Sequence, residues 1–114
     1  MIAEDTDTVR YALRVLVEHL GHQVVGIAAD GQDALEKYER VQPDVVLMDV
    51  RMPRMDGLTC TSMLTQHNPP ARVIIVTAGR TTEADARKAG ARAYVEKPFD
   101  LQQLNAVIQS AAAA

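Results

Sequence analysis

Polar side chains with complementary chemistry follow several of the apolar segments that this sequence predicts to be strands. The run 45–48 is apolar throughout, as in a strand that is covered on both faces, and it is followed directly by an acid. In open parallel sheets the carboxyl ends of the strands share one edge, where ligands bind. The side chains with this placement are Glu4, Asp5, Asp49, Thr77 and Lys97.

Three carboxylates, one hydroxyl group and one ammonium group in a common crevice could support phosphoryl transfer. Three close carboxylates repel one another, so full ionisation requires a cation. Lys97 offsets one charge, and the remaining oxygens suit a hard divalent ion such as Mg²⁺. Beside such an ion, a carboxylate can attack phosphorus while the metal and the lysine hold the phosphoryl oxygens. The product is an aspartyl phosphate.

Each of these residues also has an ordinary structural explanation. A single acid after a strand, such as Asp49, is more often the cap of a turn. Thr77 could begin a turn or a helix, and Lys97 could be a surface lysine. The recurrence of polar groups at several strand ends favours the functional interpretation.

The hydrophobic pattern predicts five strands that alternate with five helices. The strands cover residues 1–3, 24–28, 45–48, 72–77 and 93–96, and Asp30-Gly31 marks a turn after the second. Helical spacing follows each strand, with caps at Thr6, Asp7 or Thr8, at Asp56, at Thr81 or Thr82, and at Asp100. This alternation predicts an α/β fold in which a mostly parallel sheet has helices on both faces.

Length and composition are consistent with one domain and exclude several classes of protein. The chain has 114 residues and a net charge of −3, and it has no Lys or Arg run that would bind nucleic acid. Cys60 is the single cysteine, so we expect a packing residue, no disulfide and a cytoplasmic location. No segment approaches a membrane span, and no secretory signal is recognisable. His19, His22 and His67 are expected to be solvated surface residues.

The chain resembles the receiver domains of bacterial two-component response regulators, the group that includes the chemotaxis regulator. The most specific match is the segment 49–57, which reads Asp-Val-Arg-Met-Pro-Arg-Met-Asp-Gly, together with Lys97-Pro98-Phe99. Further matches are Glu4-Asp5, Asp30-Gly31 with Ala34-Leu35, Thr77-Ala78, Gly90-Ala91 and Tyr94. The resemblance implies one receiver domain over 1–114, with a flavodoxin-like, doubly wound sheet in the strand order 2-1-3-4-5.

The resemblance also implies a role for each residue of the crevice. Asp49 matches the phospho-accepting aspartate and, with Asp5, a direct ligand of Mg²⁺ or Mn²⁺. The backbone carbonyl of Arg51 matches the third protein ligand, and Glu4 matches an acid that acts on the metal through water. Thr77 and Lys97 match the residues that contact the phosphoryl group, and the bond from Lys97 to Pro98 is expected to be cis.

Tyr94 matches the aromatic residue that turns inward when Thr77 moves toward the phosphoryl group. The resemblance thus implies a switch that changes the surface of the fourth helix, fifth strand and fifth helix. Its implied partners are a sensor histidine kinase, a downstream effector or output domain, and a second copy bound through that surface. A structural alternative for Tyr94 is a half-buried sheet aromatic.

The sequence departs from the family pattern in two places. The first strand is clipped to 1–3, and the segment from Thr77 to Lys97 is about two residues shorter than the family pattern, which leaves a short fourth helix with only alanines at its apolar positions. The clipped strand favours the alternative of a receiver-fold interaction module that does not switch. An aspartyl phosphatase would need a second acid where Val50-Arg51 stands, and a flavin domain would not place Glu4-Asp5 beside its phosphate.

Overall fold

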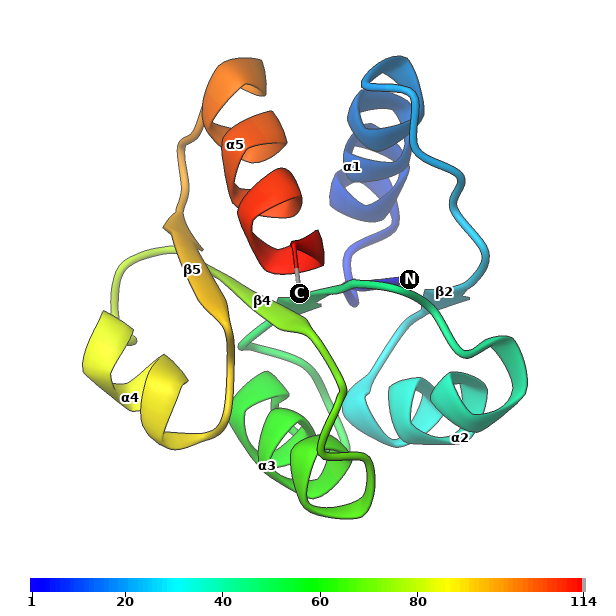
Figure 1. Cartoon of the computed structure of the whole chain (residues 1–114), viewed down its shortest axis with the longest axis vertical. Coiled ribbons are helices and arrows are strands. Elements are labelled where there is room, and N and C mark those ends of the chain that lie inside the picture. Colours follow the sequence, from blue (N-terminus) through cyan, green and yellow to red (C-terminus); the bar gives the residue numbers. More distant parts are fainter. Residues whose placement is uncertain (114) are drawn as a thin grey trace.

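The computed structural model describes residues 1–113, and its centre is a five-stranded parallel sheet (Figure 1). The strand order is β2-β1-β3-β4-β5, as the sequence analysis predicted. Two neighbouring strands at the centre of the sheet are buried along their whole length, because helices cover both of their faces. The strands are β1 (Ile2–Ala3), β2 (Ile27–Ala28), β3 (Val46–Asp49), β4 (Val73–Thr77) and β5 (Ala93–Glu96).

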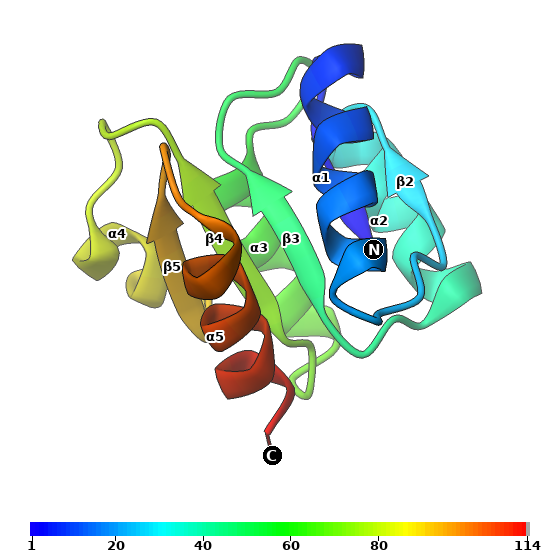
Figure 2. The ribbon, with the colours of Figure 1, turned by 90° about the horizontal axis from the view of Figure 1, so that it is seen from above.

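Five helices pack in two layers against this sheet. One layer contains α1 (Asp7–His19) and α5 (Leu101–Ala112), and the opposite layer contains α2 (Gly31–Val41), α3 (Gly57–His67) and α4 (Glu83–Lys88). Viewed from above, the strands lie side by side between the two layers (Figure 2). No helix within residues 1–113 is both long enough and apolar enough to span a bilayer.

The buried side chains form one cluster on each face of the sheet. Leu13 and Val17 of α1 pack with Leu104 and Ile108 of α5 against one face. The cluster on the opposite face includes the small residues Ala34, Cys60 and Ala86 together with the larger Leu64. Cys60 is fully buried, as predicted for a packing residue, and burial raises the pKa of its thiol to about 12.

The first two strands are much shorter than the others, and the prediction of a strand over 24–28 was wrong at its start. β1 pairs with β2 only through Ile2 with Ile27 and Ala3 with Ala28. With a partner of two residues, Val24 and Val25 have no ladder to join, so they remain outside the strand despite their high strand propensity. The clipped first strand therefore also shortens its neighbour.

Side-chain caps fix the starts of four helices. Asp30, Asp56, Thr82 and Asp100 each accept a hydrogen bond from the backbone N–H three residues later. Asp30 and the following glycine thus begin α2, where the sequence analysis predicted only a turn. Thr6 is the N-cap residue of α1, but its side chain makes no capping hydrogen bond, and its backbone N–H donates to Glu4 Oε1 at 3.1 Å.

Two further expectations concern surface features. The fourth helix is short, as predicted: α4 has six residues, and of these only Ala86 is buried. His19 and His67 are exposed as expected, whereas the prediction for His22 was wrong. His22 is half-buried and lines a cavity with Met1 and Val17.

Candidate functional site

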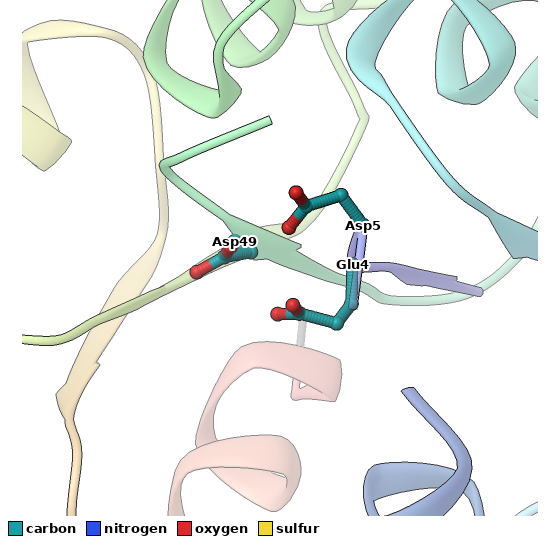
Figure 3. Close-up of side chains that lie close together, drawn as sticks. All are labelled: Glu4, Asp5 and Asp49. Carbon is teal, nitrogen blue, oxygen red and sulfur yellow. The ribbon is translucent and has the colours of Figure 1, made fainter. Parts of the chain in front are cut away.

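Three carboxylates gather where β1 and β3 end. Glu4 and Asp5 directly follow β1, and the Glu4 backbone N–H donates to the Ala28 carbonyl at 2.9 Å, which extends the ladder by one residue. Asp49 is the last residue of β3 rather than the first residue after it. One oxygen of each carboxylate lies within 4.8 Å of the others, and Figure 3 shows all three side chains reaching the same region.

Lys97 brings a positive charge to this cluster from the far side of β4. Its backbone N–H donates to the Thr77 carbonyl at 2.7 Å, so the ends of β4 and β5 are held in register. Its Nζ lies 3.5 Å from Asp49 Oδ1 and 3.6 Å from Glu4 Oε2. The Lys97–Pro98 peptide bond is cis, as the resemblance implied.

The two carboxylates that contact Lys97 are largely removed from water. Glu4 is 2% exposed and Asp49 is 9% exposed, whereas Asp5 is open to solvent. Burial raises the pKa of Glu4 and of Asp49 above their ordinary values, because a charged carboxylate is poorly solvated there. The neighbouring Asp49 carboxylate also raises the pKa of Glu4, and Lys97 lowers it but only partly compensates.

An open cavity of about 560 Å³ lies over these groups. Thr77 is 3% exposed and borders the cavity, and its Oγ1 accepts a weak hydrogen bond from the Gly79 N–H at 3.4 Å. Arg51, at the start of the loop after β3, borders the cavity as well. The structure therefore brings together all the residues that the sequence analysis placed in the crevice: Glu4, Asp5, Asp49, Arg51, Thr77 and Lys97.

The donor groups of this pocket fit a hard divalent cation. Carboxylate oxygens are the ligands that Mg²⁺ prefers, and three of them converge here. The Glu4 Oε2 atom is buried and has no hydrogen-bond partner among the described residues, so an oxygen lone pair remains unsatisfied. A cation at this position would relieve both the mutual repulsion of the acids and this unsatisfied oxygen.

Three residues that the sequence analysis did not assign also support or border the site. Arg10 Nη1 donates to the Glu4 carbonyl at 2.7 Å and so braces the segment that carries the acidic pair. An added Cβ on Gly57 would overlap the Asp49 carbonyl oxygen, so this glycine allows α3 to approach the site closely. Arg80, in the loop between Thr77 and α4, borders the cavity as well.

Tyr94 lies on β5 with its ring half-buried. Its hydroxyl group is 2.7 Å from the Thr81 carbonyl and 2.7 Å from Glu96 Oε1, and it can donate to one of them at a time. Partial burial and the neighbouring Glu96 carboxylate raise the pKa of Tyr94 to about 12. The phenol therefore remains a hydrogen-bond donor at neutral pH and ties β5 to the loop before α4.

Comparison with known proteins identifies relatives of this chain. The family model of the response regulator receiver domain matches residues 1–109. The transcriptional regulatory protein PdtaR of Mycobacterium tuberculosis (strain ATCC 25618 / H37Rv) is 39% identical over 112 residues, which are 97% of this chain and 55% of PdtaR. This chain thus spans about half the length of that relative.

A shorter relative and a solved structure agree with this match. The chemotaxis protein CheY of Thermotoga maritima is 34% identical over 101 residues, covering 87% of this chain and 84% of CheY. A chain of the CheX-CheY-BeF3-Mg+2 complex from Borrelia burgdorferi superposes with a TM-score of 0.89 at 31% identity, covering 96% of this chain and 84% of that one.

Proposed function

This chain belongs to the response regulator receiver family, and from that premise we propose that it is a signalling switch controlled by phosphorylation of Asp49. The observation that carries the proposal is the position of Lys97, whose ammonium group lies 3.5 Å from Asp49 Oδ1 at the edge where three carboxylates converge. This arrangement offers a nucleophile, a cation for the phosphoryl oxygens and ligands for a metal. The proposal treats residues 1–114 as one receiver domain.

In the proposed reaction an oxygen of Asp49 attacks the phosphorus atom of a phosphohistidine on a sensor kinase. A new O–P bond forms, the P–N bond to the imidazole breaks, and its electron pair remains on the nitrogen. Lys97 and the Thr77 hydroxyl group then hold phosphoryl oxygens, because both border the cavity above Asp49.

A divalent cation, Mg²⁺ or Mn²⁺, would be held by Asp5, Asp49 and the Arg51 carbonyl, with Glu4 acting through water. When bound, it would neutralise negative charge on the acids and on the phosphoryl group. The ionised form of Asp49 is the nucleophilic one. Burial disfavours this form by raising the pKa of Asp49, whereas the neighbouring Lys97 ammonium group favours it.

We further propose that Tyr94 reports the phosphorylation to the surface. In the present structure its hydroxyl group is held by the Thr81 carbonyl. When Thr77 is drawn toward the phosphoryl group, the following loop shifts, and Tyr94 leaves Thr81 and turns inward. The surface formed by α4, β5 and α5 changes, and it is there that an effector, an output domain or a second copy would bind.

Intact-mass spectrometry tests this function directly. The protein is incubated with acetyl phosphate in the presence and absence of Mg²⁺, and we expect a Mg²⁺-dependent gain of one phosphoryl group. Asp49→Ala should abolish the gain, whereas Asp56→Asn should retain it, because Asp56 caps α3 outside the pocket and asparagine also caps helices.

A folded protein that gains no phosphoryl group would contradict the switch. The two-residue β1 provides a specific reason to consider the alternative of an interaction module that does not switch, since this strand positions Glu4 and Asp5. That alternative predicts unchanged mass with and without Mg²⁺. A cytoplasmic location, expected from the lone Cys60, is part of either proposal.

A further inference from the structure

An ion pair outside the acidic pocket joins two loops that are distant in the sequence. Arg54 lies in the loop between β3 and α3, and Asp30 is the residue that caps α2. Arg54 Nε lies 3.0 Å from Asp30 Oδ2, and Arg54 Nη2 lies 3.1 Å from Asp30 Oδ1. Both carboxylate oxygens are thus engaged by the planar guanidinium group, which is the geometry that gives such pairs directional strength.

The backbone at Arg54 is unusual for a residue with a side chain. Its φ is 66°, in the left-handed region that favours glycine. Glycine at this position would adopt the same backbone more easily, but it would lack the guanidinium group. The arginine therefore combines an unfavourable backbone with a specific contact to Asp30.

The same loop is held at two further points. Gly31, next to Asp30, packs against the backbone of Met55, and an added Cβ there would lie 2.8 Å from Met55 Cβ. At the end of the loop the Gly57 N–H donates to the Val50 carbonyl at 2.8 Å. The segment from Val50 to Gly57 is therefore closed on itself and pressed against the start of α2.

This segment also carries Arg51 into the acidic pocket. Arg51 borders the pocket, and only the buried Met52 and the rigid Pro53 separate it from Arg54. With so short and stiff a connection, a displacement of Arg54 will be transmitted to the Arg51 backbone.

We propose that the Asp30–Arg54 ion pair positions the loop so that the Arg51 carbonyl faces Asp5 and Asp49, and that it thereby sets the affinity of the pocket for a divalent cation. This inference rests on the proposed function, because that proposal assigns the Arg51 carbonyl to the metal. Both residues are positioning residues that need no contact with the cation themselves.

The direction in which the loss of Arg54 changes the Mg²⁺ affinity distinguishes a role in positioning from a simple effect of charge. Arg54 carries a positive charge, so its removal alone should strengthen the attraction of the pocket for a cation. If the ion pair positions the loop, its loss should instead weaken binding. Charge and position thus predict opposite results for Arg54→Gln.

The test is a titration with MgCl₂, followed through backbone amide chemical shifts of the ¹⁵N-labelled protein. We expect Arg54→Gln to bind Mg²⁺ about two- to fivefold more weakly than the parent, the range that an exposed ion pair can supply. Arg54→Lys should recover part of this loss. Arg40→Gln is the matched control, because it removes one positive charge from the exposed end of α2 without touching the ion pair, and we expect no weakening there.

Asp30→Asn completes a double-mutant cycle, since asparagine keeps the cap of α2 but loses the charge. The Asp30→Asn/Arg54→Gln variant should bind no more weakly than the weaker single variant. Equal or tighter binding by Arg54→Gln would overturn the inference while leaving the proposed function in place. A parent protein that binds no Mg²⁺ would overturn both.

Discussion

The ammonium group of Lys97 lies 3.5 Å from Asp49 Oδ1, at the carboxyl edge of the parallel sheet. The same group lies 3.6 Å from Glu4 Oε2, so one cation faces two buried carboxylates. These two contacts organise the electrostatics of the pocket, and the first prediction follows from them.

Lys97→Met should slow phosphorylation of Asp49 by acetyl phosphate by roughly a hundredfold, the typical effect of removing one electrostatic contact to a transferred group. Methionine keeps most of the length of the side chain but removes its charge. The rate is measured by intact-mass spectrometry at a fixed Mg²⁺ concentration. Lys88→Met, on the exposed side of α4, is the control and should react like the parent. Equal rates for the two variants would argue against a role for Lys97.

Asp49→Asn should stabilise the metal-free fold at pH 8 by about 1 kcal/mol, in the range of ordinary single substitutions. Burial raises the pKa of Asp49 from its ordinary value of 3.8, so the folded protein holds this proton more tightly than the unfolded chain does. Stability is therefore lost as the pH rises from about that value through the higher value in the folded state. Asparagine removes this dependence.

The measurement is urea denaturation of both proteins in EDTA at pH 8 and near pH 4. The advantage of Asp49→Asn should shrink at the lower pH, because more of the parent's Asp49 carboxyl groups hold their proton there. Asp56→Asn serves as the control for an exposed acid. An equal advantage at both pH values would show that the charge of Asp49 is not its source.

Mg²⁺ should raise the melting temperature of the protein, because a ligand that binds only the folded state stabilises it by RT ln(1 + [L]/Kd). At a hundred times the dissociation constant this amounts to about 2.7 kcal/mol. Asp5→Asn should lose most of this increase in melting temperature, because Asp5 is a proposed ligand of the cation and belongs to the carboxylate cluster. Asp7→Asn, two residues later and outside the cluster, should keep it. NaCl at equal ionic strength corrects for screening, and a full response in Asp5→Asn would exclude that residue as a ligand.

Gly57→Ala should destabilise the protein by about 1–3 kcal/mol, the usual range for overpacking. Its new methyl group would overlap the Asp49 carbonyl oxygen, which is fixed backbone in β3. Gly26→Ala is the matched control, because its Cβ would meet Val41 at an ordinary distance of 3.5 Å. Chemical denaturation compares the two variants, and a similar stability for both would contradict the close approach of α3 to Asp49.

The sequence predicted structure correctly where a residue acts on its immediate neighbours in the chain. The apolar run before Asp49 predicted a covered central strand, and Asp56 and Asp100 were predicted as caps because their side chains act within the next turn. The error at Val24 and Val25 has a non-local cause. Their propensity for a strand is high, but β1 has only two residues and pairs with Ile27 and Ala28. Val24 and Val25 therefore have no residue of β1 to pair with, whatever their propensity.

The composition of the pocket was predictable, but its geometry was not. The placement of Glu4, Asp49 and Lys97 at strand ends follows from the order of the strands. The direct approach of Lys97 to both acids depends on how a flexible side chain crosses β4, and no sequence pattern encodes that path. The Asp30–Arg54 pair was hidden for a similar reason, because 24 positions separate the two residues.

The separation of the buried side chains by the sheet has a consequence for how this domain can diverge. Leu104 and its neighbours pack on one face, while Leu64 and its neighbours pack on the other, and the two clusters share no residue within the described chain. Substitutions that do not touch one another have nearly additive effects on stability. Each helical layer can therefore drift through its own series of compensating changes, and a chimaera that borrows one complete layer from a related domain needs new complementarity only to the strands between them.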